Sequence, residues 1–139
     1  MRGRVLVAAG LLFGAIVISA LASGNARRVV GNCTKSEVRP ATIVIACADD
    51  NLSLTRLRWT TFGGTQAHAS GQYYVNDCTP NCAAGRFHSY PITLVLSKAT
   101  ICPDGHDDYQ SAAVTFTTSR PAGEKSARVA QSLSCPLPG

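Results

Sequence analysis

Beyond residue 40 the chain contains short runs in which apolar and polar residues alternate, the period-two pattern of half-buried β-strands. The runs that fit this pattern, or the apolar pattern of a buried strand, are 42–47, 52–62, 67–75, 89–96 and 112–118. In the second run, Leu57 and Trp59 share one face while Arg58 lies on the other. Because Leu54 is out of phase with Leu57, we expect a β-bulge or a break near Thr55.

Two of these runs constrain how a sheet is built. The run 67–75 begins with small inward residues as far as Gly71, so a large side chain such as Trp59 is expected to lie across them. In the run 89–96, Pro91 lacks an N–H group, so we expect it at a strand start or on an edge strand.

The segment 125–135 fits either a strand or a short helix. Ala127, Val129 and Leu133 suit one face of a strand, whereas the alanine, arginine and glutamine content also suits a helix. We favour a strand that forms a hairpin with 114–118. Six short β runs, separated by turn signals and with no convincing helix, predict an all-β fold: a small antiparallel β-sandwich of about six to seven strands, stapled by disulfide bonds.

The first 26 residues do not fit this pattern. Two arginines precede an uncharged run over residues 5–22, which ends in the small-x-small sequence that signal peptidase accepts. We expect a signal peptide over 1–26, cleaved after Ala22 or Ala26, and one secreted domain over 27–139. The alternative is an uncleaved N-terminal membrane anchor that holds the domain outside the cytoplasm.

All six cysteines lie beyond that segment, and an even number in an exported chain indicates three disulfide bonds. Six cysteines allow about fifteen pairings, among which the sequence does not choose. The pairing that we favour joins Cys33 to Cys47, Cys78 to Cys82 and Cys102 to Cys135. A bond that closes a loop of about fifteen residues stabilises a fold by about 3 kcal/mol in the chain-entropy model.

The densest cluster of turn-forming residues is 76–85, Asn-Asp-Cys-Thr-Pro-Asn-Cys-Ala-Ala-Gly. Because it lies between two strand runs, it predicts a cross-linked turn. A loop held between cysteines presents a fixed backbone to a partner, so a secreted protease inhibitor is one alternative function. The loop that begins at Cys102 is a second candidate for an inhibitory loop.

The net charge is +5, and without the two arginines of the signal segment it is +3, from 11 basic and 8 acidic residues. This mild excess suits anionic cell-wall polymers or another extracellular protein as partners; we expect no nucleic acid and, after signal cleavage, no membrane. Arg56, Arg58 and Arg86 are candidates for a basic stripe on the exposed sheet face, with Tyr74 beside them to stack on a sugar ring. The simpler interpretation is a solvated face that keeps the domain soluble.

The sequence gives little support for a metal site. The motifs 78–82 and 102–106 together hold three cysteines and a histidine, a ligand set that zinc accepts, but an oxidising compartment favours disulfide bonds. The segments 49–51 and 104–108 offer oxygen ligands for calcium, but they lack the EF-hand spacing and are typical of turns. We expect no metal and no cofactor.

Candidate catalytic residues are scattered. His68 and Ser70 are neighbours on one predicted strand face, and His88 and His106 lie in or near loops. The sequence contains no Gly-x-Ser-x-Gly elbow, metalloprotease helix or phosphate-binding glycine loop. No catalytic residue is therefore named, and a small extracellular hydrolase is kept as an alternative.

Three motifs carry a resemblance: Arg39-Pro40 followed by Ile45–Asp49, then Leu57–Thr60, then the turn 76–85. They resemble uncharacterised small secreted proteins of actinobacteria, of the streptomycete and mycobacterial type, with a Trp strand and a Cys-Thr-Pro-x-Cys-Ala-x-Gly turn. The resemblance covers roughly residues 40–96 and implies export and a compact domain. It transfers no catalytic residue. We expect a secreted, non-enzymatic, disulfide-stabilised β domain that binds at the cell surface or cell wall.

Overall fold

The computed structural model describes residues 27–138, so the predicted signal segment and its cleavage sites lie outside the described residues. These residues form no helix. Their strands are β1 (Val30–Asn32), β2 (Lys35–Glu37), β3 (Ile43–Val44), β4 (Leu52–Thr61), β5 (Ala67–Asn76), β6 (Phe87–Ile101), β7 (Asp107–Phe116) and β8 (Arg128–Ser132).

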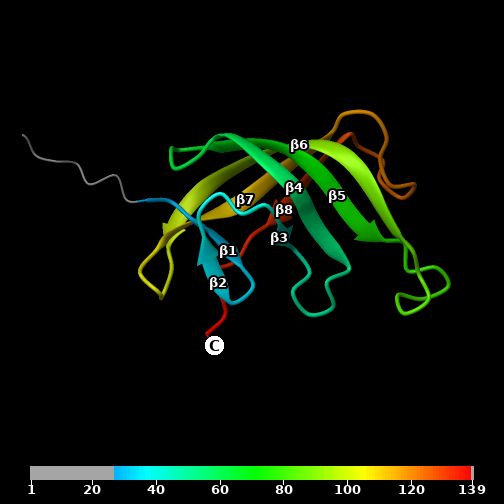
Figure 1. The fold of residues 1–139 in the computed structure, drawn as a ribbon, viewed down its shortest axis with the longest axis horizontal. Coiled ribbons are helices and arrows are strands. Elements are labelled where there is room, and N and C mark those ends of the chain that lie inside the picture. Colours follow the sequence, from blue (N-terminus) through cyan, green and yellow to red (C-terminus); the bar gives the residue numbers. More distant parts are fainter. Residues whose placement is uncertain (1–26, 139) are drawn as a thin grey trace, which may run out of the picture.

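The larger sheet is a six-stranded antiparallel meander in the order β3-β4-β5-β6-β7-β8, and β1 and β2 form a separate antiparallel pair. Figure 1 shows that the large sheet curls and that β1 and β2 lie on the side toward which it curls. The predicted all-β antiparallel fold is confirmed, with the second layer reduced to this short pair. The segment 125–135 contributes a strand, β8, which pairs with β7 as favoured.

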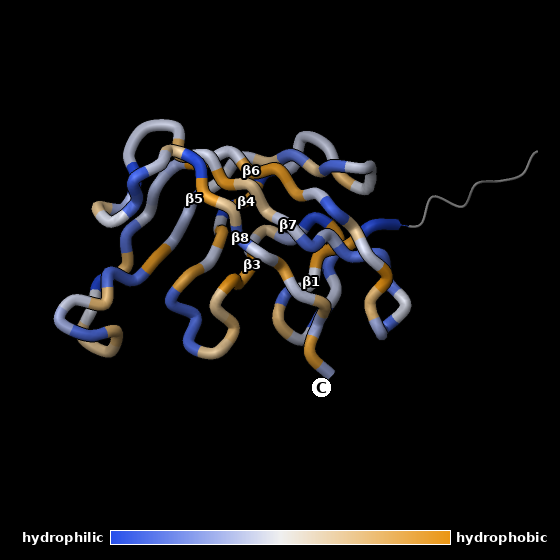
Figure 2. The backbone as a smooth tube through the Cα atoms, turned by 180° about the vertical axis from the view of Figure 1, so that it is seen from behind, coloured by the Kyte–Doolittle hydropathy of each residue, from blue (hydrophilic) through white to orange (hydrophobic). Residues whose placement is uncertain are grey.

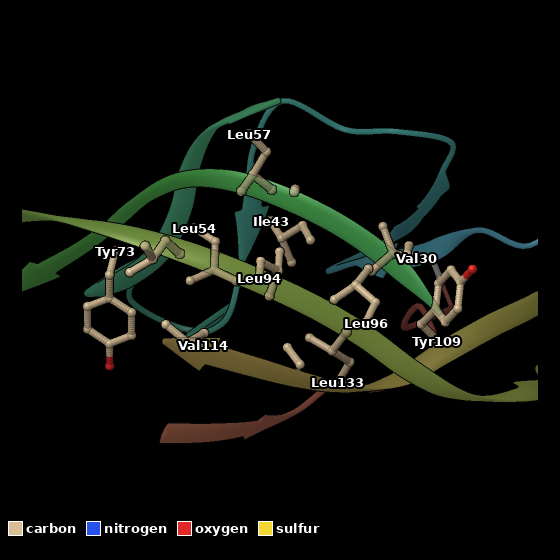
Figure 3. Close-up of a cluster of buried hydrophobic side chains, with 14 of the residues drawn as sticks. Val30, Ile43, Leu54, Leu57, Tyr73, Leu94, Leu96, Tyr109, Val114 and Leu133 are labelled. Carbon is tan, nitrogen blue, oxygen red and sulfur yellow. The ribbon is translucent and has the colours of Figure 1, made fainter. Parts of the chain in front are cut away.

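Alternating apolar residues of the large sheet point into its concave side and form the core. Figure 3 shows Val30 of the covering strand β1 and Ile43 of the edge strand β3 among the leucines of β6. Figure 2 shows hydrophobic stretches (orange) interspersed with hydrophilic ones (blue) along the chain. The buried members of the cluster are Val30, Ile43, Leu54, Leu57, Ala67, Ala69, Tyr73, Ile92, Leu94, Leu96, Tyr109, Ala112, Val114, Phe116 and Leu133.

Three disulfide bonds join the favoured pairs, and none of the six cysteines is free. The Cys33–Cys47 bond ties the end of β1 to the loop after β3, and the Cys102–Cys135 bond ties the end of β6 to the tail after β8. The backbone N–H of Leu137 in that tail donates a hydrogen bond of 2.8 Å to the carbonyl of Cys33. The two long-range bonds therefore anchor the segments that cover the concave face.

A β-bulge interrupts the pairing of β4 with β5 next to Thr55, as the phase of the leucines predicts. Thr55 pairs with Gln72 and Arg58 pairs with Ser70, so the two residues between them on β4 face one residue on β5. That single residue is Gly71.

Gly71 is required because the bulge crowds it. A Cβ atom there would lie 2.7 Å from the carbonyl oxygen of Thr55 and 2.8 Å from Cδ2 of Leu57. Trp59 is the register partner of Ala69, in line with the expectation that it lies across small residues of β5, and Leu57 fills the space over Gly71.

The expectation for Pro91 is wrong, because Pro91 lies inside β6, a central strand, where it pairs with Gln72 of β5. The carbonyl of Pro91 accepts a hydrogen bond of 3.0 Å from the N–H of Thr117. The nitrogen of Pro91 lies on the same side of β6 as this carbonyl, so it faces β7. At that point the pairing of β6 with β7 has already ended, with Ile92 opposite Phe116. No strand residue there requires the missing N–H, so the proline is tolerated.

We predict that Gly71→Ala lowers the free energy of unfolding by about 1–3 kcal/mol, because the added methyl group overpacks the bulge. Urea denaturation measures this change. The matched control is Gly123→Ala, since a Cβ atom at Gly123 meets no atom within 4 Å. Equal effects of the two substitutions would show that the bulge does not require glycine.

Candidate functional site

The outward side chains of β4, β5 and β6 form one polar face on the convex side of the sheet. Arg58, Ser70 and Thr93 lie side by side in register across the three strands. All three are exposed. The face is therefore open to a partner.

This face carries no acidic residue, since β4, β5, β6 and β8 contain neither aspartate nor glutamate. The acidic residues lie on β2, at the start of β7 and in loops: Glu37, Asp49, Asp50, Asp77, Asp104, Asp107, Asp108 and Glu124. The face is consequently neutral to cationic, although the domain as a whole is only mildly basic.

Two shallow hollows adjoin on this face. The first has a volume of about 650 Å³ and is lined in part by Arg56, Gln72, Tyr74 and Ser89. The second has a volume of about 420 Å³ and is lined in part by Arg56, Arg58 and Gln72. Because both hollows are lined by Arg56 and Gln72, they adjoin at these two residues, and we call the pair the β4–β6 track.

Two of the predicted arginines supply the charge of this track. Neither Arg56 nor Arg58 takes part in any ion pair found among residues 27–138. Arg56 is the first residue of the bulge and has a φ of 52°, a left-handed conformation that favours glycine. Holding an L-residue there costs about 1 kcal/mol or more, and such strain is concentrated at functional sites.

Tyr74 lies at one end of the track and stacks on Phe87, with ring centroids 4.7 Å apart and an interplanar angle of 14°. The two residues are 38% and 42% exposed. Phe87 was not among the residues predicted for this face, although it precedes Ser89 by two residues and so continues the same outward alternation of β6.

Arg86 is not part of the track. It precedes β6 and lines neither hollow. Its backbone N–H donates to Oδ1 of Asp77 at 2.9 Å, and its carbonyl accepts from the N–H of Asp77 at 2.9 Å. The structure thus brings together Arg56, Arg58 and Tyr74 and leaves Arg86 in the neighbouring turn.

The turn 76–85 is cross-linked as predicted and is also held by side-chain hydrogen bonds. The amide nitrogen of Asn76 donates to the carbonyl of Cys82 at 2.8 Å and to Oδ1 of Asn51 at 2.9 Å. Its Oδ1 accepts from the N–H of Cys78 at 3.0 Å. Residues 79–84 at the tip remain exposed, so the turn presents a pre-organised surface.

Asp77 of this turn pairs with His88 of β6, and both line a hollow of about 470 Å³. The carboxylate accepts hydrogen bonds from the backbone N–H groups of Arg86 and Thr79 and lies 2.9 Å from Nε2 of His88. These contacts lower the pKa of Asp77 to about 2. The largest cause is the hydrogen bond from the N–H of Arg86, followed by those from His88 and from the N–H of Thr79. This contact ties His88 of β6 to the turn, and no hydroxyl hydrogen-bonds to His88 among the described residues.

A second polar cluster joins β2 to the loop after β6. Oδ2 of Asp104 accepts from the hydroxyl of Ser36 at 2.8 Å and lies 3.1 Å from Nδ1 of His106. Burial, followed by the charge of Asp104, raises the pKa of the fully buried Asp108, whose carboxyl oxygens lie 3.4 Å from the same hydroxyl. Because Asp104 separates the serine from the histidine, His106 is not placed to accept the serine proton as a catalytic base.

The remaining sequence candidates do not combine into a site. His68 and Ser70 are both exposed on β5, as expected. The disulfide bonds contradict the zinc alternative, because they occupy all of its cysteines. Within the described part of the chain, no group of three or more His, Cys, Asp or Glu residues is placed to hold a metal ion.

Comparisons with protein-family models, with curated proteins and with solved structures find no match for this chain. Residues 27–138 include no helix of the length and apolar character needed to span a membrane.

We predict that the contribution of Asp77 to stability is present above about pH 4 and is lost as the pH falls toward 2. The pKa of Asp77 is lowered to about 2 in the fold, against about 3.9 in an unfolded chain, so folding favours the ionised form. The difference in unfolding free energy between the wild type and Asp77→Asn, measured in urea, should therefore shrink between pH 5 and pH 2. Asp49→Asn, in another exposed turn, is the control; a difference for Asp77→Asn that does not change with pH would refute this role.

Proposed function

We propose that this protein is a secreted, non-enzymatic, disulfide-stabilised domain that binds an anionic cell-wall polymer through the β4–β6 track. Export is supported by the three disulfide bonds, which persist in oxidising compartments outside the cytosol. It is supported further by the basic start and apolar run of the first 26 residues.

The observation that carries the binding proposal is the placement of Arg56. A glycine would relieve its left-handed backbone, yet the position holds an exposed arginine on a face without acidic residues. Arg56 lines both hollows of the track, and Arg58 extends the charge into the second. A guanidinium group binds phosphate or carboxylate through two parallel hydrogen bonds, which suits a repeating anionic polymer.

The protease-inhibitor alternative is favoured by one observation, the exposed tip of the cross-linked turn 76–85. Its backbone is fixed by the Cys78–Cys82 bond and by Asn76, so a protease would bind it at low entropic cost. Assays against subtilisin-like and trypsin-like proteases test it, and absence of inhibition at micromolar concentration removes it.

We predict that Arg56→Gly separates binding from stability. The substitution relieves the left-handed backbone and should leave the unfolding free energy unchanged or raise it by about 1 kcal/mol. It should weaken binding to purified bacterial cell wall at low ionic strength by about tenfold, since a hydrogen bond to a charged group contributes about 1.5–3 kcal/mol. Sedimentation with the wall measures the bound fraction, and high salt should abolish it for the wild type.

The matched control is Lys35→Gln, because Lys35 is an exposed cation on β2, away from the convex face. Arg58→Gln should act like Arg56→Gly, and Lys35→Gln should leave binding unchanged. Failure of the wild type to bind at low ionic strength, or equal binding by the wild type and Arg56→Gly, would count against the proposal.

A further inference from the structure

The aromatic pair at the end of the track has no role in binding charge. Among the exposed large hydrophobic side chains of residues 27–138, two are aromatic, Tyr74 and Phe87. Their rings stack on each other at the solvent-exposed surface. Tyr74 lines the first hollow and Phe87 does not, so Phe87 supports Tyr74 from the side away from the hollow. The stack fixes the orientation of the tyrosine ring before any ligand binds, which lowers the entropic cost of binding.

The polar groups around the same hollow suit sugar hydroxyls. Ser89 is the register partner of Tyr74, and its hydroxyl lies 3.4 Å from Oε1 of Gln72. The amide of Gln72 and the hydroxyl of Ser89 both donate and accept hydrogen bonds, as sugar hydroxyls require. The hollow thus combines a fixed aromatic ring, neutral polar groups and, at its border, one guanidinium.

The order of these groups along the track indicates where the ligand carries its charge. Tyr74 lines only the first hollow, Arg56 lines both, and Arg58 lines only the second. Arg56 therefore lies where the two hollows adjoin, at the border of the ring subsite, and Arg58 lies beyond it. This arrangement suits a polymer whose charge lies in the links between its sugar units, and not on the rings themselves.

We propose that the first hollow is a sugar subsite for a polymer in which sugar rings are joined through phosphodiester links. Tyr74, positioned by Phe87, stacks on the apolar face of one sugar ring, Gln72 and Ser89 bind its hydroxyls, and Arg56 binds the adjoining phosphate. This assignment rests on the proposed function and narrows it from any anionic polymer to a sugar–phosphate polymer.

Titration calorimetry of the exported protein, with its disulfide bonds intact, tests the subsite with three probes at equal charge concentration. The probes are a sugar–phosphate polymer, inorganic polyphosphate and a uronic-acid polymer. The wild type should bind the sugar–phosphate polymer about tenfold more tightly than either of the others. Tyr74→Leu should remove that preference and leave polyphosphate binding unchanged, whereas Arg56→Gln should weaken binding of all three.

Two further variants separate stacking from folding. Tyr74→Phe keeps the ring and should retain the preference, and Phe87→Leu should lose part of it because the tyrosine is no longer held. Both positions are exposed, so circular dichroism should show a native fold for each variant.

The outcomes distinguish this subsite from the proposed function. Equal affinity for the sugar–phosphate polymer and polyphosphate, or a preference that survives Tyr74→Leu, overturns the sugar subsite while polyanion binding stands. Tighter binding of the uronic-acid polymer overturns the phosphodiester link. No binding of any probe at low ionic strength overturns the proposed function itself.

Discussion

A single curled sheet buries its apolar face only if another segment covers that face. Here two short segments from the ends of the domain cover it: the strand β1 and the C-terminal tail after β8. The covering strand β1 is three residues long and forms a ladder only with β2. An isolated two-stranded pair of this kind is at best marginally stable in water. The Cys33–Cys47 and Cys102–Cys135 bonds attach this strand and the C-terminal tail to the rest of the domain. The core therefore depends on covalent links between segments that are distant in sequence.

This construction determines which surface is free to act. Because the concave side is filled by the core, the convex side of β4–β6 remains the broad exposed face. That face carries no acidic residue, and the bulge in β4 presents Arg56 on it. The β-bulge thus affects both the shape of the sheet and its charge. It requires Gly71 on the neighbouring strand β5, and it places Arg56 on the exposed face.

The sequence alone predicts the long strands of the large sheet, since alternation directly reflects which face is buried, and it predicts the bulge through the phase of Leu54 and Leu57. It does not predict β1 and β2, because the segment before residue 40 shows no such alternation. It does not predict the place of Pro91, because tolerance depends on where β7 ends beside it. The stacking of Phe87 on Tyr74 and the exclusion of Arg86 from the track likewise follow from strand register. Register describes how two strands pair, and the hydrophobic pattern of a single strand does not specify it.

The dependence of the fold on its long-range disulfide bonds is tested most directly by the free energy of unfolding before and after reduction. Urea denaturation of the protein with its disulfide bonds intact, and then of the reduced protein with its thiols blocked, gives both values. Loops of the size closed by Cys33–Cys47 and Cys102–Cys135 predict a loss of about 3 kcal/mol or more for each bond, enough to unfold a marginally stable domain. An unfolding free energy that is unchanged by reduction would contradict this view of the molecule.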